Sequence, residues 1–168
     1  MSPIRWALII ESMRTTLAAP TVRPKTIDFP VSVEWLGGRR VLACVGGKPE
    51  LPVAPPLVFR GTDADIWSPE DLFVAAAASC LAVTFTGLVE RSNVHLSSLR
   101  VDGEGVVGRR EDGHFGFTSV ELRLRAVVAA SDSDLAHALA LKAEDSCLVS
   151  HSFALPVHVS VDVRTAGE

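Results

Sequence analysis

Residues 68–80 of the chain read SPEDLFVAAAASC, and this stretch predicts the start of the central helix of the fold. Ser68 is a favoured helix N-cap, Pro69 suits the first helical position, and the next two residues place acidic side chains in the first turn. The residues that follow, as far as Arg91, are nearly all apolar, so we expect one long helix that is buried on all sides. A chain of 168 residues has too little material to wrap such a helix completely. We therefore expect a partner subunit to cover part of it.

Length and composition indicate one folded domain. Hydrophobic residues make up 48% of the 168 residues and charged residues 21%, which is enough apolar material for a core. We expect residues 1–25 to form a flexible N-terminal extension, with Met13 as an alternative start, and residues 26–168 to form a single domain. The formal net charge of −4 gives no reason to expect a nucleic acid as a partner.

The sequence shows no clear pattern for export or membrane insertion. The apolar run at residues 6–10 is shorter than the apolar region of a secretory signal. The most apolar stretch, Leu72 to Leu88, is shorter than the roughly 20 residues that a membrane-spanning helix needs. The 3 cysteines, an odd number, indicate free thiols in a reducing compartment rather than a structural disulfide framework. We expect a cytoplasmic protein that does not bind a membrane.

Two β-rich runs precede the long helix. Residues 30–46 are typical of a β-hairpin with Gly37-Gly38 at its turn, and residues 47–68 form a proline-punctuated connection. Cys44 lies in the second strand of this hairpin, where a buried and unreactive thiol is the expected state.

The elements after the long helix complete an α+β pattern. We expect antiparallel strands over residues 99–107 and 115–129, since apolar and charged residues alternate along the second one, with Gly113 at the turn between them. The serine and aspartate residues at 131–134 are expected to cap a second helix that ends near residue 145, and residues 157–163 alternate as a final strand. The order ββ–α–ββ–α–β is typical of an α+β fold.

Two cysteine motifs in this sequence resemble those of the OsmC/Ohr family, the osmotically inducible protein C and organic hydroperoxide resistance proteins. The helix of residues 68–80 resembles the family's prolyl-acidic helix start, followed by a reactive cysteine at Cys80. Residues 143–150, AEDSCLVS, resemble the family's second cysteine motif around Cys147. The resemblance covers about residues 30–163 and departs from the family pattern at Leu148, where the family usually has proline.

The hairpin turn completes the resemblance. Gly37-Gly38-Arg39 looks like the turn that carries the family's active-site arginine, and Arg40 and Arg60 compete with Arg39 for this assignment. The resemblance implies an α+β fold in which antiparallel sheets wrap around central buried helices in an intertwined homodimer. Membership of the Ohr-like or the OsmC-like subgroup stays open.

The resemblance also implies a function, that of a thiol-dependent peroxidase which reduces organic hydroperoxides in oxidative-stress defence, with no cofactor. Its implied catalytic residues are Cys80 as the attacking thiolate, Cys147 as the resolving thiol that forms a disulfide with it, and Arg39 and Glu70 as the pair that favours the thiolate. The implied reductant is a small dithiol or a lipoylated protein. This chemistry needs a thiol that ionises near neutral pH, and an arginine held by a carboxylate is suited to promote ionisation.

Helix geometry makes it improbable that all of these residues come from one subunit. In a continuous helix, Glu70 lies about 15 Å from Cys80 along the axis, at 1.5 Å of rise per residue. Either the helix begins later than Ser68 indicates, or Glu70 and Arg39 act on Cys80 of a second subunit. We favour the second interpretation, because the apolar helix already predicts a dimer.

Several apolar residues are candidates to line an approach for alkyl or fatty-acid hydroperoxides, although most of them are equally suited to a plain core. These residues are Leu72, Phe73, Phe85, Trp67 and Phe153.

Two other classes of function compete with the peroxidase. One is a non-enzymatic dimer that carries a small hydrophobic ligand, in which the cysteines are incidental. The other is a metal site that includes Cys147 and His151, whose spacing suits zinc, but no second close pair of ligands accompanies them.

Overall fold

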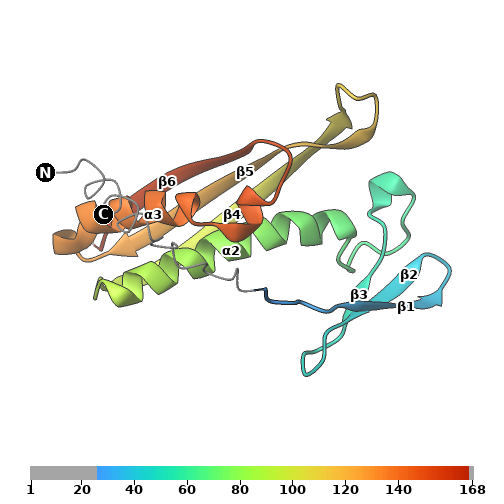
Figure 1. Ribbon diagram of the computed structural model, residues 1–168, viewed down its shortest axis with the longest axis horizontal. Coiled ribbons are helices and arrows are strands. Elements are labelled where there is room, and N and C mark those ends of the chain that lie inside the picture. Colours follow the sequence, from blue (N-terminus) through green and yellow to red (C-terminus); the bar gives the residue numbers. More distant parts are fainter. Residues whose placement is uncertain (1–25, 167–168) are drawn as a thin grey trace, which may run out of the picture. The chain divides into compact units, whose positions relative to one another are not determined.

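The computed structural model describes residues 26–166, so the predicted extension over residues 1–25 lies outside the described part. Val31–Glu168 form one compact unit. Its strands form two three-stranded sheets, β1-β2-β3 and β4-β5-β6, and these sheets with their helices confirm the predicted α+β class (Figure 1). The elements in chain order are β1 (Ser32–Gly37), β2 (Arg40–Cys44), β3 (Leu51–Val53), η1 (Leu57–Phe59), α2 (Pro69–Arg91), β4 (Leu96–Arg109), β5 (Phe115–Val128), η2 (Ala130–Asp132), α3 (Ser133–Asp145), α4 (Leu148–His151) and β6 (Val157–Thr165).

The first sheet contains the predicted hairpin. β1 and β2 pair antiparallel, and the turn between them holds Gly37 and Gly38 at φ values of 106° and 58°, which glycine adopts without steric cost. β3 was not predicted, because Pro52 at its centre argues against a strand; it is tolerated because β3 lies at the edge of the sheet. Five of the six residues of β1 are exposed in the single chain, Trp35 by 74%.

The start of α2 confirms the sequence prediction in detail. The backbone N–H of Asp71 donates to Ser68 Oγ at 3.0 Å, and the Ser68 N–H donates to Asp71 Oδ2 at 2.9 Å, so that the two residues form a reciprocal capping box. Pro69 occupies the first helical turn, where its missing amide hydrogen costs no helical bond. The helix then runs without interruption for 23 residues.

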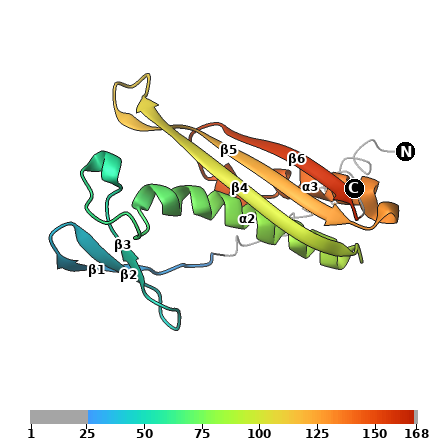
Figure 2. The same ribbon diagram turned by 180° about the vertical axis from the view of Figure 1, so that it is seen from behind.

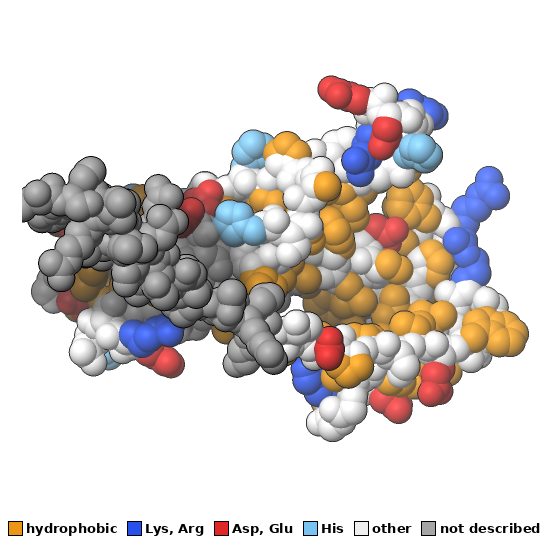
Figure 3. Space-filling view, in the orientation of Figure 1, with side chains coloured by type: hydrophobic (Ala, Val, Ile, Leu, Met, Phe, Trp, Pro, Cys, Tyr) orange, Lys and Arg blue, Asp and Glu red, His pale blue; other side chains and the backbone are white. Residues whose placement is uncertain are grey.

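Only one face of α2 is buried within the single chain, so the expectation of burial on all sides is not met at this level. The buried side chains recur every fourth residue, at Ala77, Leu81, Phe85 and Val89, whereas Val83 on another face is 70% exposed. Figure 3 shows hydrophobic side chains gathered at the surface where α2 begins.

The helix is also long and apolar enough to cross a membrane by length and composition alone, contrary to the sequence estimate based on Leu72 to Leu88. Its buried stripe packs in the same hydrophobic cluster as side chains of β5 and α3.

The core lies between the second sheet and the helices. Figures 1 and 2, seen from opposite sides, show α2 and α3 on the same face of this sheet. The inward side chains of β5 are almost completely buried, and they share one cluster with the buried stripe of α2 and three alanines of α3. The β5 residues in this cluster are Val120, Leu122, Leu124, Ala126 and Val128.

Two glycines of β4 let α2 approach the sheet closely. A Cβ atom at Gly103 would lie 2.8 Å from Val74 Cγ1, and one at Gly105 would lie 2.7 Å from Val74 Cγ2 and 2.5 Å from Phe117 Cε1. Since real Cβ atoms do not come so close to their neighbours, larger residues at these positions would push the helix away. The glycines therefore set the depth of the groove between α2 and β4.

The second sheet differs from the predicted antiparallel arrangement in one strand. β4 and β5 pair antiparallel about a turn at Gly113, as expected, and both extend close to the predicted limits. β6, however, pairs parallel to β5, with Leu122 opposite Val159. The reason is the connection between the two strands. α3 and α4 cross over the face of the sheet and bring the chain back to the end of the sheet where β5 begins, which is the usual way to join parallel strands.

Asp132 is the N-cap residue of the second helix, as predicted, but no side-chain hydrogen bond caps this helix. The chain makes the 3-10 helix η2 before α3 begins at Ser133, and the side chain of Asp132 does not cap α3. Its Oδ2 instead accepts a hydrogen bond of 3.0 Å from the backbone N–H of His95, just before β4. Asp132 therefore ties the end of β5 to the start of β4, a contact that local sequence does not reveal.

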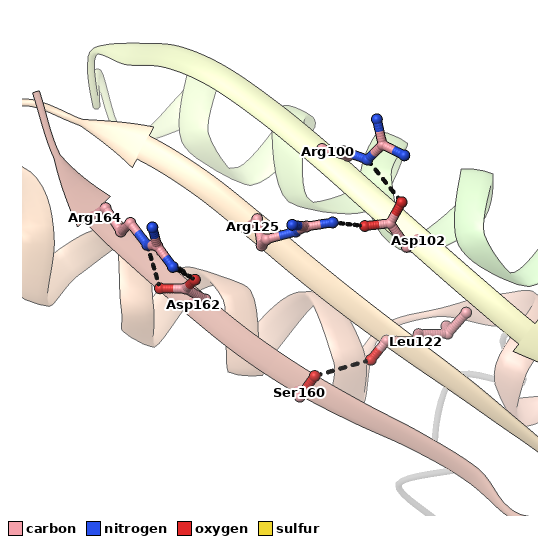
Figure 4. Close-up of polar contacts among 7 residues, drawn as sticks. All are labelled: Arg100, Asp102, Leu122, Arg125, Ser160, Asp162 and Arg164. Carbon is pink, nitrogen blue, oxygen red and sulfur yellow. Dashed lines mark hydrogen bonds and ion pairs between the residues drawn. The ribbon is translucent and has the colours of Figure 1, made fainter.

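The other face of the second sheet carries charged side chains (Figure 4). Arg100 on β4 and Arg125 on β5 both contact the carboxylate of Asp102, and Arg164 pairs with Asp162 on β6 at 2.7 Å. Hydrogen bonds from these arginines hold the pKa values of Asp102 and Asp162 below their usual range. A layer of ion pairs is typical of a solvated sheet face, so the site must be sought on the helix side.

Candidate active site

The fold brings two of the predicted catalytic residues together. Cys80 lies in the middle of α2 and is partly exposed, whereas Cys147 lies between α3 and α4 with only 1% of its surface exposed. Cys147 is the N-cap residue of the four-residue helix α4, with φ and ψ of −73° and 101°. Both cysteines are free thiols.

The surroundings of Cys80 favour its thiolate. Burial alone raises the pKa of the thiol, but hydrogen-bond donors around the sulfur outweigh burial, and the pKa lies below its ordinary value. These donors are the backbone N–H of Val149, the Cys147 thiol, the Thr84 hydroxyl and the backbone N–H of Leu148. The beginning of α4 therefore supplies to Cys80 part of the stabilisation that the sequence assigned to an arginine.

Leu148, where the sequence departs from the family pattern, takes part in this arrangement through its backbone. A proline at this position would have no N–H to offer to the Cys80 sulfur. Leu148 is the first residue of α4, and its side chain is 72% exposed. The departure therefore changes the environment of Cys80 through the main chain rather than through side-chain packing.

Cys147 has a different hydrogen-bond donor. The hydroxyl of Ser150, one turn further along α4, donates to Cys147 Sγ at 3.1 Å. Ser150 and Thr84 were not identified from the sequence. Thr84 stands four residues after Cys80 on the same helix, and this spacing alone was the signal available for it.

Arg39 does not meet Cys80 or Glu70 within the described residues. It lies at the β1–β2 turn, where its Nη1 donates to the carbonyl oxygens of Phe59 at 2.9 Å and of Arg60 at 3.1 Å. It lines a pocket of about 510 Å³ together with its two competitors, Arg40 and Arg60. Within the described part of the single chain, the four predicted catalytic residues therefore do not form one site: Cys80 and Cys147 meet, whereas Arg39 lies elsewhere.

Arg39 and Arg40 differ in their contacts. Arg40 forms an ion pair with Asp63, which lowers the pKa of that carboxyl group through hydrogen bonding. Its charge is therefore already compensated. Among residues 26–166, the hydrogen bonds of Arg39 go to neutral carbonyl groups and not to a carboxylate, so Arg39 is a better candidate than Arg40 for stabilising a thiolate.

Glu70 lies in the first turn of α2, whereas Cys80 lies in the middle of this helix. Because α2 is continuous from Pro69, the alternative in which the helix begins later is excluded, and the axial separation of about 15 Å stands. Glu70 borders a groove of about 620 Å³ between α2 and β4, and its Oε2 is buried with no hydrogen-bond partner among residues 26–166. Such a carboxylate oxygen is free to accept a hydrogen bond from a further donor.

The expected substrate-lining residues do not form one group. Phe73 stacks on Phe117 and on Phe153, with ring centroids 4.4 Å and 4.2 Å apart, and Trp67 lines the groove beside Glu70. Phe85 is completely buried in the core, so its assignment to a substrate approach is wrong. Phe117 was missed, because its position in β5 gave no sign that it would meet α2.

The candidate metal ligands also separate. His151, at the end of α4, has its Nε2 2.8 Å from the carbonyl oxygen of Asp145 rather than near the Cys147 sulfur. Over residues 26–166, no group of three or more histidine, cysteine, aspartate or glutamate side chains is arranged to hold a metal ion.

Comparison with known proteins places this geometry in a family. The family model described as OsmC-like protein matches residues 61–162, which include both paired cysteines and Glu70 but not Arg39. The protein YmaD of Bacillus subtilis is 32% identical over 147 residues, a match that covers 83% of this chain and 97% of YmaD.

Solved structures share the fold at lower identity. An OsmC-like protein of unknown function from Vibrio cholerae has a TM-score of 0.74 at 18% identity, covering 81% of this chain and 99% of that one. An organic hydroperoxide resistance protein from Elizabethkingia anophelis has a TM-score of 0.66 at 22% identity, covering 86% and 100%. The organic hydroperoxide resistance protein OhrB of Bacillus subtilis has a TM-score of 0.56 at 20% identity, covering 82% and 98%. Since the family model spans more than half of the sequence and the fold agrees, the chain belongs to the family of OsmC-like proteins.

Proposed function

We propose that this protein is a thiol-dependent peroxidase that reduces organic hydroperoxides. The observation that carries the proposal is the meeting of two thiols from distant parts of the chain, one of which, Cys80, has a lowered pKa. A thiolate is the nucleophile that attacks a peroxide, and a second thiol nearby is what a sulfenic acid needs to form a disulfide. A pair of incidental core cysteines would not need these donors.

The proposed reaction has two chemical steps on the protein. The Cys80 thiolate attacks the distal oxygen of the hydroperoxide, so that an S–O bond forms, the O–O bond breaks and an alcohol leaves after protonation. Cys147 then attacks the sulfur of the Cys80 sulfenic acid, so that an S–S bond forms and the oxygen leaves as water. A small dithiol or a lipoylated protein, as the family resemblance suggests, returns both thiols to the reduced state.

We further propose that a homodimer completes the site, with Glu70 and Arg39 of one subunit acting on the partly exposed Cys80 sulfur of the other. Three features support this assembly: the buried, unpartnered oxygen of Glu70, the exposed side chains of β1, and the uncovered face of α2. An arginine would satisfy the Glu70 carboxylate and add positive charge next to the thiolate.

The groove between α2 and β4 supports an organic rather than an inorganic peroxide. Apolar side chains line much of it, and Glu70 lies at its edge. The apolar part of this lining is suited to an alkyl chain. The free thiols agree with action in a reducing, cytoplasmic compartment during oxidative stress.

Intact mass and free-thiol counts after one equivalent of cumene hydroperoxide test the proposal. The wild type is expected to lose two thiols and the mass of two hydrogen atoms. Cys147→Ser should accumulate a sulfenic acid that dimedone traps, and Cys80→Ser should not react. A wild type that keeps all of its thiols would refute the peroxidase function.

The same groove favours a second candidate, a dimer that binds a small hydrophobic ligand without chemistry. This protein would bind an apolar fluorescent probe whether or not Cys80 is present, and stoichiometric peroxide would not remove two thiols together. The thiol count therefore separates the two functions.

A further inference from the structure

The two sulfurs of the candidate site have separate hydrogen-bond donors. Backbone N–H groups at the beginning of α4 and the Thr84 hydroxyl act on Cys80, whereas the Ser150 hydroxyl donates to Cys147 Sγ at 3.1 Å. Cys147 is 1% exposed, so water has little access to its sulfur. A buried thiolate without a donor is unfavourable, and Ser150 provides the one side-chain hydroxyl bonded to this sulfur in the described part of the chain.

We propose that Ser150 activates Cys147 for disulfide formation, by holding its sulfur toward Cys80 and by stabilising the thiolate that attacks the Cys80 sulfenic acid. This inference rests on the proposed peroxidase function and assigns a third residue to its second step. Ser150 acts on a reacting atom, but it exchanges no electrons and keeps its own proton.

The resolving step balances without another reactant. Cys147 gives up its thiol proton, and its sulfur attacks the sulfur of the Cys80 sulfenic acid. The S–S bond forms as the S–O bond breaks, and the departing hydroxide takes a proton to become water. The hydrogen bond from Ser150 stabilises the negative charge that Cys147 carries just before the attack.

The local geometry explains why a serine at this position can reach the sulfur. Cys147 is the N-cap of α4 and Ser150 is the third residue of that helix, the same relation that lets capping-box side chains reach back to the N-cap. The backbone N–H of His151 donates to the Cys147 carbonyl at 3.1 Å, which closes the turn. The imidazole of His151 is directed to the Asp145 carbonyl, so this titratable side chain of α4 does not serve as the base for Cys147.

Ser152 provides a matched control within the same segment. Its hydroxyl donates to the Leu148 carbonyl at 2.8 Å and not to a sulfur. Ser152→Ala therefore removes a hydroxyl and a local hydrogen bond without touching the thiol pair. Ser150→Thr keeps a hydroxyl at the proposed position and serves as the conservative rescue.

The experiment follows single turnovers of the full chain with cumene hydroperoxide. Rapid quenching with dimedone measures the lifetime of the sulfenic acid, and intact mass measures the disulfide. In Ser150→Ala, the first step should keep its rate, whereas the sulfenic acid should persist about tenfold longer, the effect of losing a hydrogen bond to a charged group. Both Ser150→Thr and Ser152→Ala should resemble the wild type.

Each contrary outcome identifies what has failed. A wild type that forms no sulfenic acid or disulfide overturns the peroxidase function and this inference with it. A wild type that forms the disulfide while Ser150→Ala forms it equally fast overturns only the role of Ser150. Equal slowing in Ser150→Ala and Ser152→Ala would also overturn it, because the cause would then be the structure of α4.

Discussion

The backbone N–H of Leu148 is one of the groups that lower the pKa of Cys80, although the two residues are far apart in the sequence. Leu148 is the first residue of α4, a helical position where proline is well tolerated. Cys147 before it has a ψ of 101°, an extended conformation that is compatible with a following proline. The N–H can therefore be removed without disturbing the helix.

Leu148→Pro should raise the pKa of Cys80 and slow its reaction with hydroperoxide at neutral pH, by no more than about tenfold, because one donor among several is lost. Ultraviolet titration of the thiolate and rapid kinetics measure the two effects. Leu148→Ala keeps the N–H and should titrate like the wild type. An unchanged pKa in Leu148→Pro would show that the remaining donors suffice.

The three cysteines should differ in their reactivity toward iodoacetamide. The lowered pKa of Cys80 means that its thiolate persists as the pH falls through the usual thiol range and is lost only below its own pKa. Burial raises the pKa of Cys44, and Glu50 and Glu34 raise it further, so Cys44 should stay protonated where Cys80 is ionised. Mass mapping at neutral pH should find Cys80 alkylated first. Preferential labelling of Cys44 would contradict this order.

Gly105→Ala should destabilise the fold, because its Cβ would lie 2.5 Å from Phe117 Cε1 and 2.7 Å from Val74 Cγ2. Overpacking of this kind costs about 1–3 kcal/mol of unfolding free energy. Gly108 on the same strand is a matched control, since its Cβ would meet Thr118 Cγ2 at an ordinary 3.7 Å. Urea unfolding of both variants measures the difference, and an equal loss in both would show that close packing against α2 is not the cause.

Mixed dimers test whether the site is shared between subunits. Cys80→Ser and Arg39→Ala are each expected to be inactive as homodimers. When the two are unfolded and refolded together, each mixed dimer should have up to about half of the activity of a wild-type dimer, because one of its two sites is then complete. Arg40→Ala should keep most of its activity, since Arg40 is already paired with Asp63. No recovery on mixing, with mixed dimers confirmed by native mass spectrometry, would show that the site is not shared.

Local signals predicted the elements of this fold well and the contacts between them less well. Ser68, Pro69 and Asp71 determine the start of α2 through interactions within one turn, and Gly37 and Gly38 determine the hairpin in the same way. The parallel pairing of β6 and the contact from Asp132 to the His95 amide depend on where the chain returns in space. Local sequence patterns do not show where the chain returns, so these contacts could not be predicted from them.

The candidate site shows the same division. The resemblance of the two cysteine motifs predicted that Cys80 and Cys147 belong together, and the structure brings them together. The sequence did not predict the roles of Ser150 and the N–H of Val149. A serine in a short helix and a backbone amide occur throughout the chain, and nothing in the sequence shows that these two lie near a sulfur. The assignments of Arg39 and Glu70 stay predictions, which the mixed-dimer experiment tests.

The parallel pairing of β5 with β6 has a consequence for the newly made protein. Cys147 lies in the crossover between these strands, 67 residues after Cys80 in the chain. Contacts between segments distant in sequence form slowly in folding, and this crossover is synthesised after α2. A nascent chain therefore exposes Cys80 before its neighbour is in place, and the thiol acquires its donors only at the end of folding. Under the proposed function, the protein would therefore become active only once this crossover has packed against α2.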